Sequence, residues 1–338
     1  MIRQIRNQLW LIALALLSSI CHAESVDTSD IYGPGVTEAL NAIIAARAEL
    51  ESWVLNGKCT VKYSDSDDIC ESAVYGAFDK SSNQFRFETK GSYRAAQLTS
   101  GEFQGAGSNE ERLLLSASRR RLHNSLSLIV KNRNFMLEWY GLGDLKDPER
   151  TTCNLELRDL DSPPSRIASL AFNPSAAGLI DVLSSSPMDS VKEILEKYSH
   201  GASAVTLEKG AENGIKIVYT YGRKARRLLF VDPENAFTVT HSIKIGLDES
   251  GNQRDFPVTE SGAKWESKNG VQIPTGVYWS RSTSVDTISR TEYKIAWGSI
   301  NPKTIDDKTF DYKTFVGFWP GLNLVDRRDG KLELLDSP

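Results

Sequence analysis

The clearest pattern along the chain is an alternation of apolar and polar residues between positions 237 and 245. The apolar residues fall on one side of an extended chain: Phe237, Val239, Ile243 and Ile245. The residues between them are polar: Thr238, Thr240, Ser242 and Lys244. This two-residue period predicts a strand with one buried face, and His241 falls on the side expected to be buried.

Turn sequences join this strand to similar neighbours. Arg226–Val231 precedes it across Asp232–Asn235, whose Asp-Pro-Glu-Asn sequence is typical of a type I turn. Further along, Asn269-Gly270 favours the primed turns that close hairpins. The stretch 291–299 also alternates, and one of its sides carries large residues: Tyr293, Ile295 and Trp297. Because no apolar helix separates these strands, we expect antiparallel pairing.

The first half of the chain predicts one helix followed by strands. The apolar residues of the helix recur at spacings of three and four: Val36, Leu40, Ile43, Ile44 and Leu50. Thr37 is the candidate N-cap of this helix. The clearest strands that follow are Trp53–Tyr63, Val74–Phe78 and Gln84–Thr89. A helix with a single apolar stripe is expected to lie against a sheet.

Two short helices are expected between the two series of strands. The first is Ala176–Leu183, and the second is capped by Asp189 or Ser190 and ends at Gly201. The second helix has one apolar stripe: Val191, Ile194, Leu195 and Tyr198. This order predicts the α+β class, with a large curved antiparallel sheet, an unclosed half-barrel, and a few helices covering its concave face. We expect one domain over residues 24–338, and two domains meeting near residue 166 are the alternative.

The first 23 residues resemble a secretory signal peptide. Arg3 and Arg6 precede the apolar run Leu9–Ile20, and Ala23 ends a small-residue cleavage site. Residues 24–35 are then a loose leader. Removal of residues 1–23 leaves 38 basic and 44 acidic residues, a mild net charge of −6 that argues against a nucleic-acid partner. No later segment is long and apolar enough to span a bilayer, so we expect an exported protein, periplasmic or secreted.

Candidate chemistry is sparse. Of the cysteines that remain after cleavage, Cys59 and Cys70 could pair across a loop, and free thiols, Cys153 included, are the alternative. No metal or cofactor is expected, since no spacing of a known metal or nucleotide motif occurs. His241 is the one residue to test as a general base. We favour a hydrogen-bonded histidine near the core and expect no catalytic residue.

Several segments of the second half resemble the bacterial outer-membrane lipoprotein-sorting (LolA/LolB-like) superfamily. The segments that carry the resemblance are Phe230–Glu234, Trp265-Glu266, Gly270–Pro274, Glu292–Trp297, Ile300-Asn301, Phe310 and Val325–Lys331. The resemblance implies an unclosed antiparallel β-barrel whose hydrophobic concavity is plugged by helices. It also implies a role in carrying the acyl chains of lipoproteins.

The leading hypothesis is an exported, non-enzymatic protein that binds an apolar ligand, a lipid or a lipoprotein acyl chain, in a half-barrel cavity. Strand parity selects seven residues to line this cavity: Phe237, Val239, Ile243, Ile245, Tyr293, Ile295 and Trp297. The alternatives are an envelope interaction module whose core is fully packed and a hydrolase that uses His241. A filled concave face would favour the interaction module. The sequence leaves the ligand and the oligomeric state open.

Overall fold

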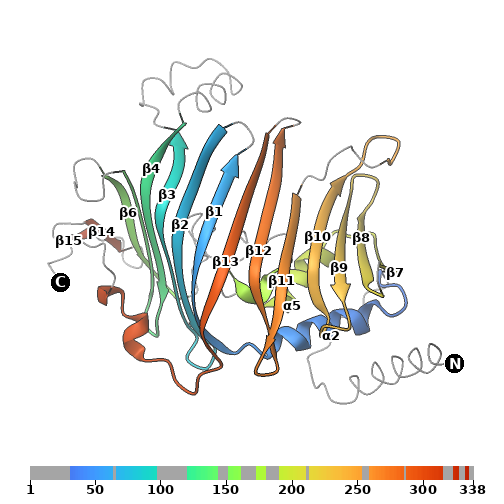
Figure 1. Cartoon of the computed structure of the whole chain (residues 1–338), viewed down its shortest axis with the longest axis horizontal. Helices are drawn as coiled ribbons and strands as arrows, with labels where there is room; N and C mark the ends of the chain where they lie inside the picture. Colours follow the sequence, from blue (N-terminus) through green and yellow to red (C-terminus); the bar gives the residue numbers. More distant parts are fainter. Residues whose placement is uncertain are drawn as a thin grey trace. The chain divides into compact units, whose positions relative to one another are not determined.

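The computed structural model describes residues 31–63, 66–96, 120–143, 151–160, 173–179, 190–210, 213–252, 259–284, 287–314, 323–326 and 332–334. The expected signal peptide and most of the leader lie outside this part of the chain. Two compact units are formed, which we call unit 1 (residues 1–51 and 172–292) and unit 2 (residues 52–171 and 293–338) (Figure 1). Each unit is described by itself, and the single domain expected from the sequence stays a prediction.

The strands form an open sheet. Their hydrogen-bonded order is β15-β14-β6-β5-β4-β3-β2-β1-β13-β12-β11-β10-β9-β8-β7, and the end strands β15 and β7 are not paired with each other in the described part of the chain. Adjacent strands are antiparallel from β1 to β6 and from β7 to β12, while β14 pairs with β6 in parallel. The predicted α+β class with an unclosed antiparallel sheet is confirmed.

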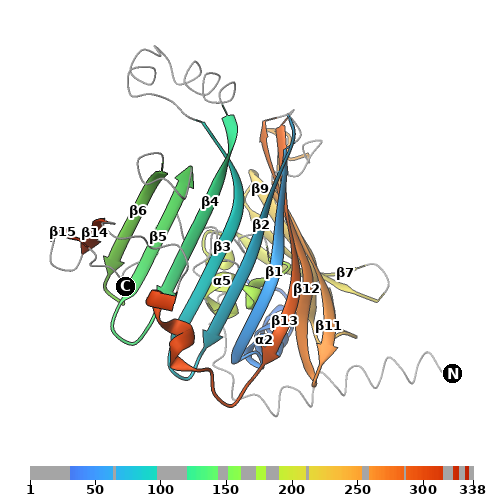
Figure 2. The ribbon, with the colours of Figure 1, turned by 60° about the vertical axis from the view of Figure 1, so that its left-hand side comes forward.

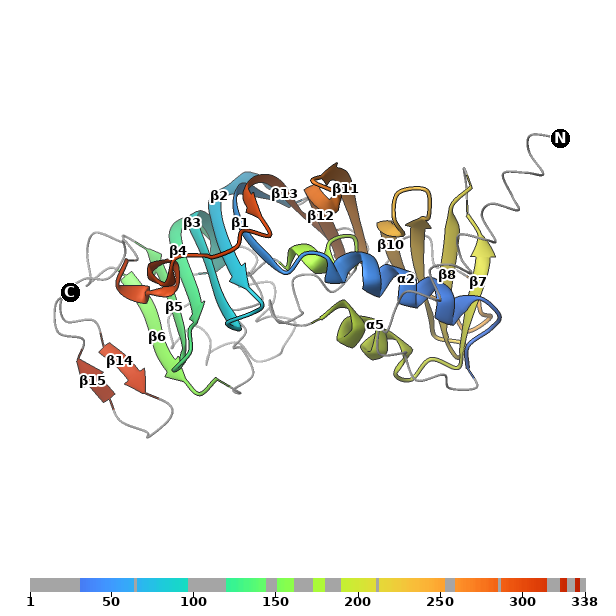
Figure 3. The ribbon, with the colours of Figure 1, turned by 90° about the horizontal axis from the view of Figure 1, so that it is seen from below.

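Unit 1 combines helices with six complete strands. These are α2 (Val36–Ala48), η3 (Pro174–Ala176), α5 (Val191–Ser199), β7 (Ala204–Lys209), β8 (Ile215–Tyr221), β9 (Ala225–Asp232), β10 (Thr238–Gly246), β11 (Thr259–Lys268) and β12 (Val271–Ser284). Figure 3 shows α2 and α5 on the same side of these strands, and α2 contacts β7, β10 and β12. The two helices predicted from their apolar stripes therefore cover one face of the sheet, as expected.

The helix ends show which capping predictions hold. Gly35, with a φ of 77°, precedes α2, and no side chain caps this helix, so the prediction of Thr37 as its cap is wrong. Ser190 caps α5 through a capping box: its hydroxyl accepts from the amide of Glu193, whose carboxylate accepts from the amide of Ser190. Of the two caps considered for this helix, the structure selects Ser190. The predicted helix Ala176–Leu183 is wrong over residues 176–179, because the 3-10 turn η3 ends at Ala176 and Gly178 has a φ of 83°; residues 180–183 lie outside the described part.

Unit 2 contains the strands of the first half of the chain and two short strands near its end. These are β1 (Ser52–Tyr63), β2 (Ser66–Asp79), β3 (Gln84–Ala96), β4 (Arg120–Lys131), β5 (Met136–Gly143), β6 (Thr151–Arg158), β14 (Asn323–Asp326) and β15 (Leu332–Leu334), with the 3-10 turns η4 (Asp307–Phe310) and η5 (Tyr312–Thr314). Strand β13 (Thr287–Ile300) begins in unit 1 and ends in unit 2. Figure 2 shows β1 to β6 side by side, with the segment that contains η4 lying against this row of strands.

A β-bulge in β10 changes which residues share a face. Val239 pairs with Val231 and His241 pairs with Phe230, so Thr240 is an extra residue with no partner on β9. Val231 and Phe230 are consecutive and point to opposite faces, and their partners must do the same. His241 therefore lies on the face opposite Val239.

The bulge splits the apolar face predicted for this strand. Beyond it, Ser242 pairs with the fully buried Leu229, so Ser242 takes the face of Val239. Ile243 and Ile245 lie on the other face with His241, while Phe237 belongs to the turn before the strand, with a φ of 54°. The prediction that these apolar residues share one face is wrong, because a single extra residue reverses every later side chain.

Candidate functional site

The face of unit 1 beneath the helices is occupied by packed side chains. The guanidinium carbon of Arg227 lies 3.5 Å from the ring centre of Tyr198 in α5, and Tyr198 meets Tyr219 edge to face at 5.8 Å. Val239 and Leu229 on the same face have no exposed surface. Helical side chains thus fill the part of the face on which Val239 lies.

Arg47 is a buried cation on this helix-covered face. Its side chain stacks on Trp265 of β11, with 3.6 Å from the guanidinium carbon to the ring centre. The residue is 6% exposed, and neither terminal nitrogen has a hydrogen-bond partner among the described residues. Burial lowers the pKa of Arg47 to about 9.

The partners that Arg47 does have recover only part of the cost of burying it. A desolvated cation–π contact contributes about 2 kcal/mol. The carboxyl end of a helix, where Arg47 lies, adds about 0.3–1 kcal/mol. An ion transferred into a protein interior loses several kcal/mol of hydration. In the described part of the chain, the guanidinium therefore has no acceptor that would compensate its burial.

A polar and aromatic cluster surrounds His241 on the opposite face of unit 1. His241 Nε2 lies 3.4 Å from Glu260 Oε1, and the Tyr278 hydroxyl donates to the same oxygen at 2.8 Å. Gly262 lies between His241 and Tyr278 in the ladder, and a Cβ atom there would come within 2.3 Å of the Tyr278 ring. His241 is half-buried and has an acidic side chain beside it, and a catalytic role for His241 stays a prediction.

Replacement of Glu260 by glutamine is expected to lower the pKa of His241 further. Burial already lowers this pKa below its ordinary value, and the charge of Glu260 opposes the effect. Because this pKa is lower in the folded protein, His241 takes up its proton at a higher pH in the unfolded chain than in the folded chain. The free energy of unfolding therefore falls as the pH decreases from the ordinary histidine pKa toward the folded pKa. An NMR titration of the His241 ring checks the shift, with Glu266→Gln, an exposed neighbour on β11, as control. An unchanged or raised pKa in Glu260→Gln would contradict the assignment.

An apolar cluster covers one face of β4 to β6 in unit 2. Its members are Leu126, Leu128, Val130, Leu137, Trp139 and Leu157, each at most 7% exposed. The ladder pairs Leu128 with Trp139 and Val130 with Leu137, so these side chains share a face. Phe135 and Tyr312 pack against the cluster.

A buried arginine holds the 3-10 segment over the same face. Arg86 pairs with Val130 in the ladder, so both side chains point to the side of the apolar cluster. Its Nη1 donates to the carbonyl oxygens of Thr309 at 2.9 Å and Asp311 at 3.1 Å, and to Thr314 Oγ1 at 2.6 Å. Glu88 forms an ion pair with the same guanidinium. These bonds fix η4 and η5 against β3.

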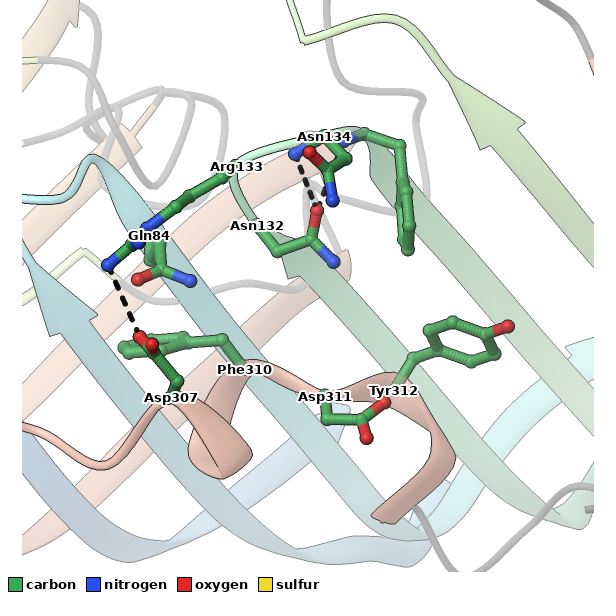
Figure 4. Close-up of a pocket in the computed structure, with 9 residues that line it drawn as sticks. Gln84, Asn132, Arg133, Asn134, Asp307, Phe310, Asp311 and Tyr312 are labelled. Carbon is green, nitrogen blue, oxygen red and sulfur yellow. Dashed lines mark hydrogen bonds and ion pairs between the residues drawn. The ribbon is translucent and has the colours of Figure 1, made fainter.

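A pocket of about 360 Å³ lies between the β4–β5 turn and the 3-10 segment (Figure 4). Its lining residues are Gln84, Asn132, Arg133, Asn134, Phe135, Asp307, Phe310, Asp311 and Tyr312. The Asn132 side chain shapes the turn by accepting from the amides of Asn134 at 2.9 Å and Phe135 at 3.1 Å. Phe135 and Tyr312 meet edge to face at 5.7 Å, so the pocket shares these two rings with the border of the apolar cluster.

The polar groups of the pocket carry both signs of charge. Arg133 and Asp307 form an exposed ion pair at 3.5 Å on its rim. Gln84 is only 4% exposed, and its Oε1 has no hydrogen-bond partner among the described residues. A buried amide without a partner is costly, and a bound polar group would satisfy it. The pocket therefore suits a polar group attached to an apolar body.

Cys59 and Cys70 are both buried, and no disulfide joins them. Cys59 pairs with Ser72 and Cys70 pairs with Val61, so the cysteines are diagonal neighbours in the β1–β2 ladder. Burial raises the pKa of Cys59 to about 11, which keeps its thiol protonated. The side chain of Cys153 lies outside the described part. Of the two alternatives left open by the sequence, the structure has thiols rather than a disulfide at Cys59 and Cys70.

The residues selected by strand parity fall into two sets. The β10 residues belong to unit 1 and are divided between two faces. Tyr293, Ile295 and Trp297 belong to unit 2, where Tyr293 is buried and Trp297 meets Trp53 edge to face at 6.3 Å. A role in lining a ligand cavity stays a prediction for both sets.

Sequence reasoning missed the residues that make the pocket and the buried arginines. Two signals were available. Arg47 continues the apolar helix stripe, four residues after Ile43, and Arg86 lies between two buried phenylalanines.

Among the described residues, no helix is long and apolar enough to cross a membrane. The same residues contain no group of three His, Cys, Asp or Glu side chains arranged to hold a metal ion.

Comparison with known proteins gives distant structural likenesses. No family model and no curated protein matches the sequence. A DUF1329 family protein from Desulfovibrio piger is 10% identical, with 82% of this chain and 97% of that chain covered and a TM-score of 0.42. A LolA superfamily protein from Nitrosomonas europaea is 11% identical, with 82% and 97% covered and a TM-score of 0.36.

A third similar structure is a domain from Vibrio parahaemolyticus named for outer membrane lipoprotein sorting. It is 7% identical, with 80% of this chain and 95% of that chain covered and a TM-score of 0.41. The superfamily that the sequence resembles is thus found among the similar solved structures. At these identities and TM-scores, no residue role and no activity is transferred from them.

Proposed function

We propose that this chain is an exported binding protein that holds an acyl chain, from a lipid or a lipoprotein, on the apolar face of unit 2. The observation that carries the proposal is the position of the pocket beside the apolar cluster. Phe135 and Tyr312 border both, so a ligand could place its polar group in the pocket and its chain along the cluster.

The apolar cluster and the polar rim of the pocket together support an amphipathic ligand. Burial of each methylene contributes about 0.8 kcal/mol, so a chain of modest length would suffice for tight binding. Gln84 and the mixed charges on the rim offer both donors and acceptors to a polar group. No covalent step is part of the proposal, and the export rests on residues 1–23 of the sequence.

Arg86 supplies the means of access to the apolar face. It holds η4 and η5 through hydrogen bonds to two backbone carbonyls and to Thr314 Oγ1, beside the apolar contacts of Phe310 and Tyr312. Such bonds can be exchanged for bonds to water at a small net cost, about 0.5–1.5 kcal/mol each. Displacement of this segment would expose the cluster to an entering chain.

Quenching by a brominated fatty acid tests the site. We expect bound bromine atoms to quench the fluorescence of Trp139, which lies inside the cluster. Trp139→Phe, a conservative change, should remove most of the quenching, whereas Trp279→Phe in unit 1 should leave it. Organic extraction of the native protein should in addition release a lipid that mass spectrometry detects. Absence of both quenching and lipid would contradict the proposal.

One observation favours the second candidate function, an envelope interaction module. In unit 1, the helix-covered face around Val239 is filled by side chains. The interaction-module hypothesis requires such a filled face. Under this alternative the apolar cluster of unit 2 is core rather than a ligand site. The same quenching experiment separates the two candidates, because a packed core admits no fatty acid.

A further inference from the structure

The position of Arg47 points to a ligand of unit 1. Figure 3 shows α2 crossing the row of strands in unit 1, and Arg47 lies in its last turn. The stripe that buries Leu40 and Ile43 continues through Arg47, which places a cation where an apolar residue would be expected. Its two terminal nitrogens are buried and lack hydrogen-bond partners among the described residues.

A second polar group without a partner lies on the same face. Trp265 pairs with Pro274 and Ser267 pairs with Gln272, so Gln272 is a diagonal neighbour of Trp265 on its face of the sheet. The Oε1 atom of Gln272 is buried and has no hydrogen-bond partner among the described residues. Rotation of the amide by half a turn would present its Nε2 donor instead. Two side chains on the face of Trp265 therefore leave hydrogen-bonding capacity unused.

We propose that an oxyanion, a carboxylate or a phosphate, binds to Arg47 between α2 and β11. Trp265 covers one flat face of the guanidinium, and the N–H groups point outward in the plane of the group. They remain available for the paired hydrogen bonds that guanidinium groups make with carboxylates and phosphates. The inference does not depend on the acyl-chain proposal, since it concerns residues of unit 1 and is tested with different probes.

Replacement of Arg47 by methionine gives two readouts. Without added anion, the melting temperature of Arg47→Met should equal or exceed that of the native protein, because an unpaired buried cation is replaced by an apolar chain. Inorganic phosphate or octanoate should raise the melting temperature of the native protein. The variant should bind the same anion about tenfold or more weakly, as expected for the loss of charge-assisted hydrogen bonds.

Arg227→Met is the matched control. Arg227 is also 6% exposed and stacks on an aromatic ring at 3.5 Å, but it makes further interactions. This variant should melt at a lower temperature and should still respond to the anion. A response to octanoate that exceeds those to acetate and phosphate would identify a fatty-acid carboxylate, and a response to phosphate alone a phosphoryl group.

Three results would overturn the proposal. The first is that no oxyanion raises the melting temperature of the native protein at constant ionic strength. The second is that uncharged 1-octanol stabilises it as well as octanoate does, since charge then has no part in binding. The third is that Arg47→Met responds to the anion as the native protein does.

Discussion

Replacement of Trp139 by alanine is expected to lower the free energy of unfolding by about 3–5 kcal/mol. Trp139 has no exposed surface and lies opposite Leu128 at the centre of the apolar cluster of unit 2. Truncation removes the largest side chain of the cluster and leaves a cavity that β-strands cannot close, because their backbone ladder holds them apart. Urea unfolding followed by circular dichroism measures the change.

Trp297→Ala is the comparison for this experiment. Trp297 belongs to the same unit, but it is half-buried and touches Trp53 at its edge. Its truncation should therefore cost clearly less than that of Trp139. Equal losses for both variants, or a loss below about 1 kcal/mol for Trp139→Ala, would show that Trp139 is not closely packed in the ligand-free protein.

Replacement of Arg86 by methionine is expected to destabilise the protein by roughly 3–5 kcal/mol, the range found when one partner of a buried ion pair is removed. Arg86 is buried, and its Nη1 serves three acceptors in the 3-10 segment. Methionine fills a similar volume but leaves those oxygens and the Glu88 carboxylate without their donor. Denaturant unfolding gives the total loss, and hydrogen exchange of residues 307–314 reports release of the segment.

Arg290→Met serves as the control for Arg86. Arg290 also pairs with a glutamate two residues away, at 2.7 Å from Glu292, but its side chain is 45% exposed. An exposed pair of this kind contributes about 0–1 kcal/mol. The segment with η4 and η5 forms one wall of the pocket, so Arg86→Met should also weaken fatty-acid quenching of Trp139. Unchanged exchange in residues 307–314 would refute the role given to Arg86.

Local signals were sufficient for the elements of the fold and for much of the strand pairing. The hairpin between β9 and β10 follows from Asp232, whose carboxylate accepts from the amides of Glu234 and Asn235. The hairpin between β11 and β12 follows from Asn269 and Gly270, which both adopt the positive φ of a primed turn. Each of these signals acts within a few residues, so the sequence alone reveals it.

The candidate site could not be predicted in the same way. The bulge at Thr240 has no marker in the alternation, and it moved Ile243 and Ile245 to the face opposite Val239. Strand parity follows the residues of one strand, whereas the face of each side chain follows from its hydrogen-bonded partner on the next strand. One extra residue in a strand therefore changes the face of every residue after it. For this reason the β10 residues do not share one face, while a role of the seven residues in lining a cavity stays a prediction.

By itself, the sequence determined most of the described secondary structure, the α+β class and the open antiparallel sheet, because turn propensity and the period of apolar residues are local properties. Tertiary structure alone decided where the chemistry lies. Arg86 meets Thr309 across 223 positions of the chain, and Arg47 meets Trp265 from a helix that precedes every strand. Such contacts depend on how distant elements pack. Only the tertiary structure shows that the terminal nitrogens of Arg47 are buried without hydrogen-bond partners among the described residues.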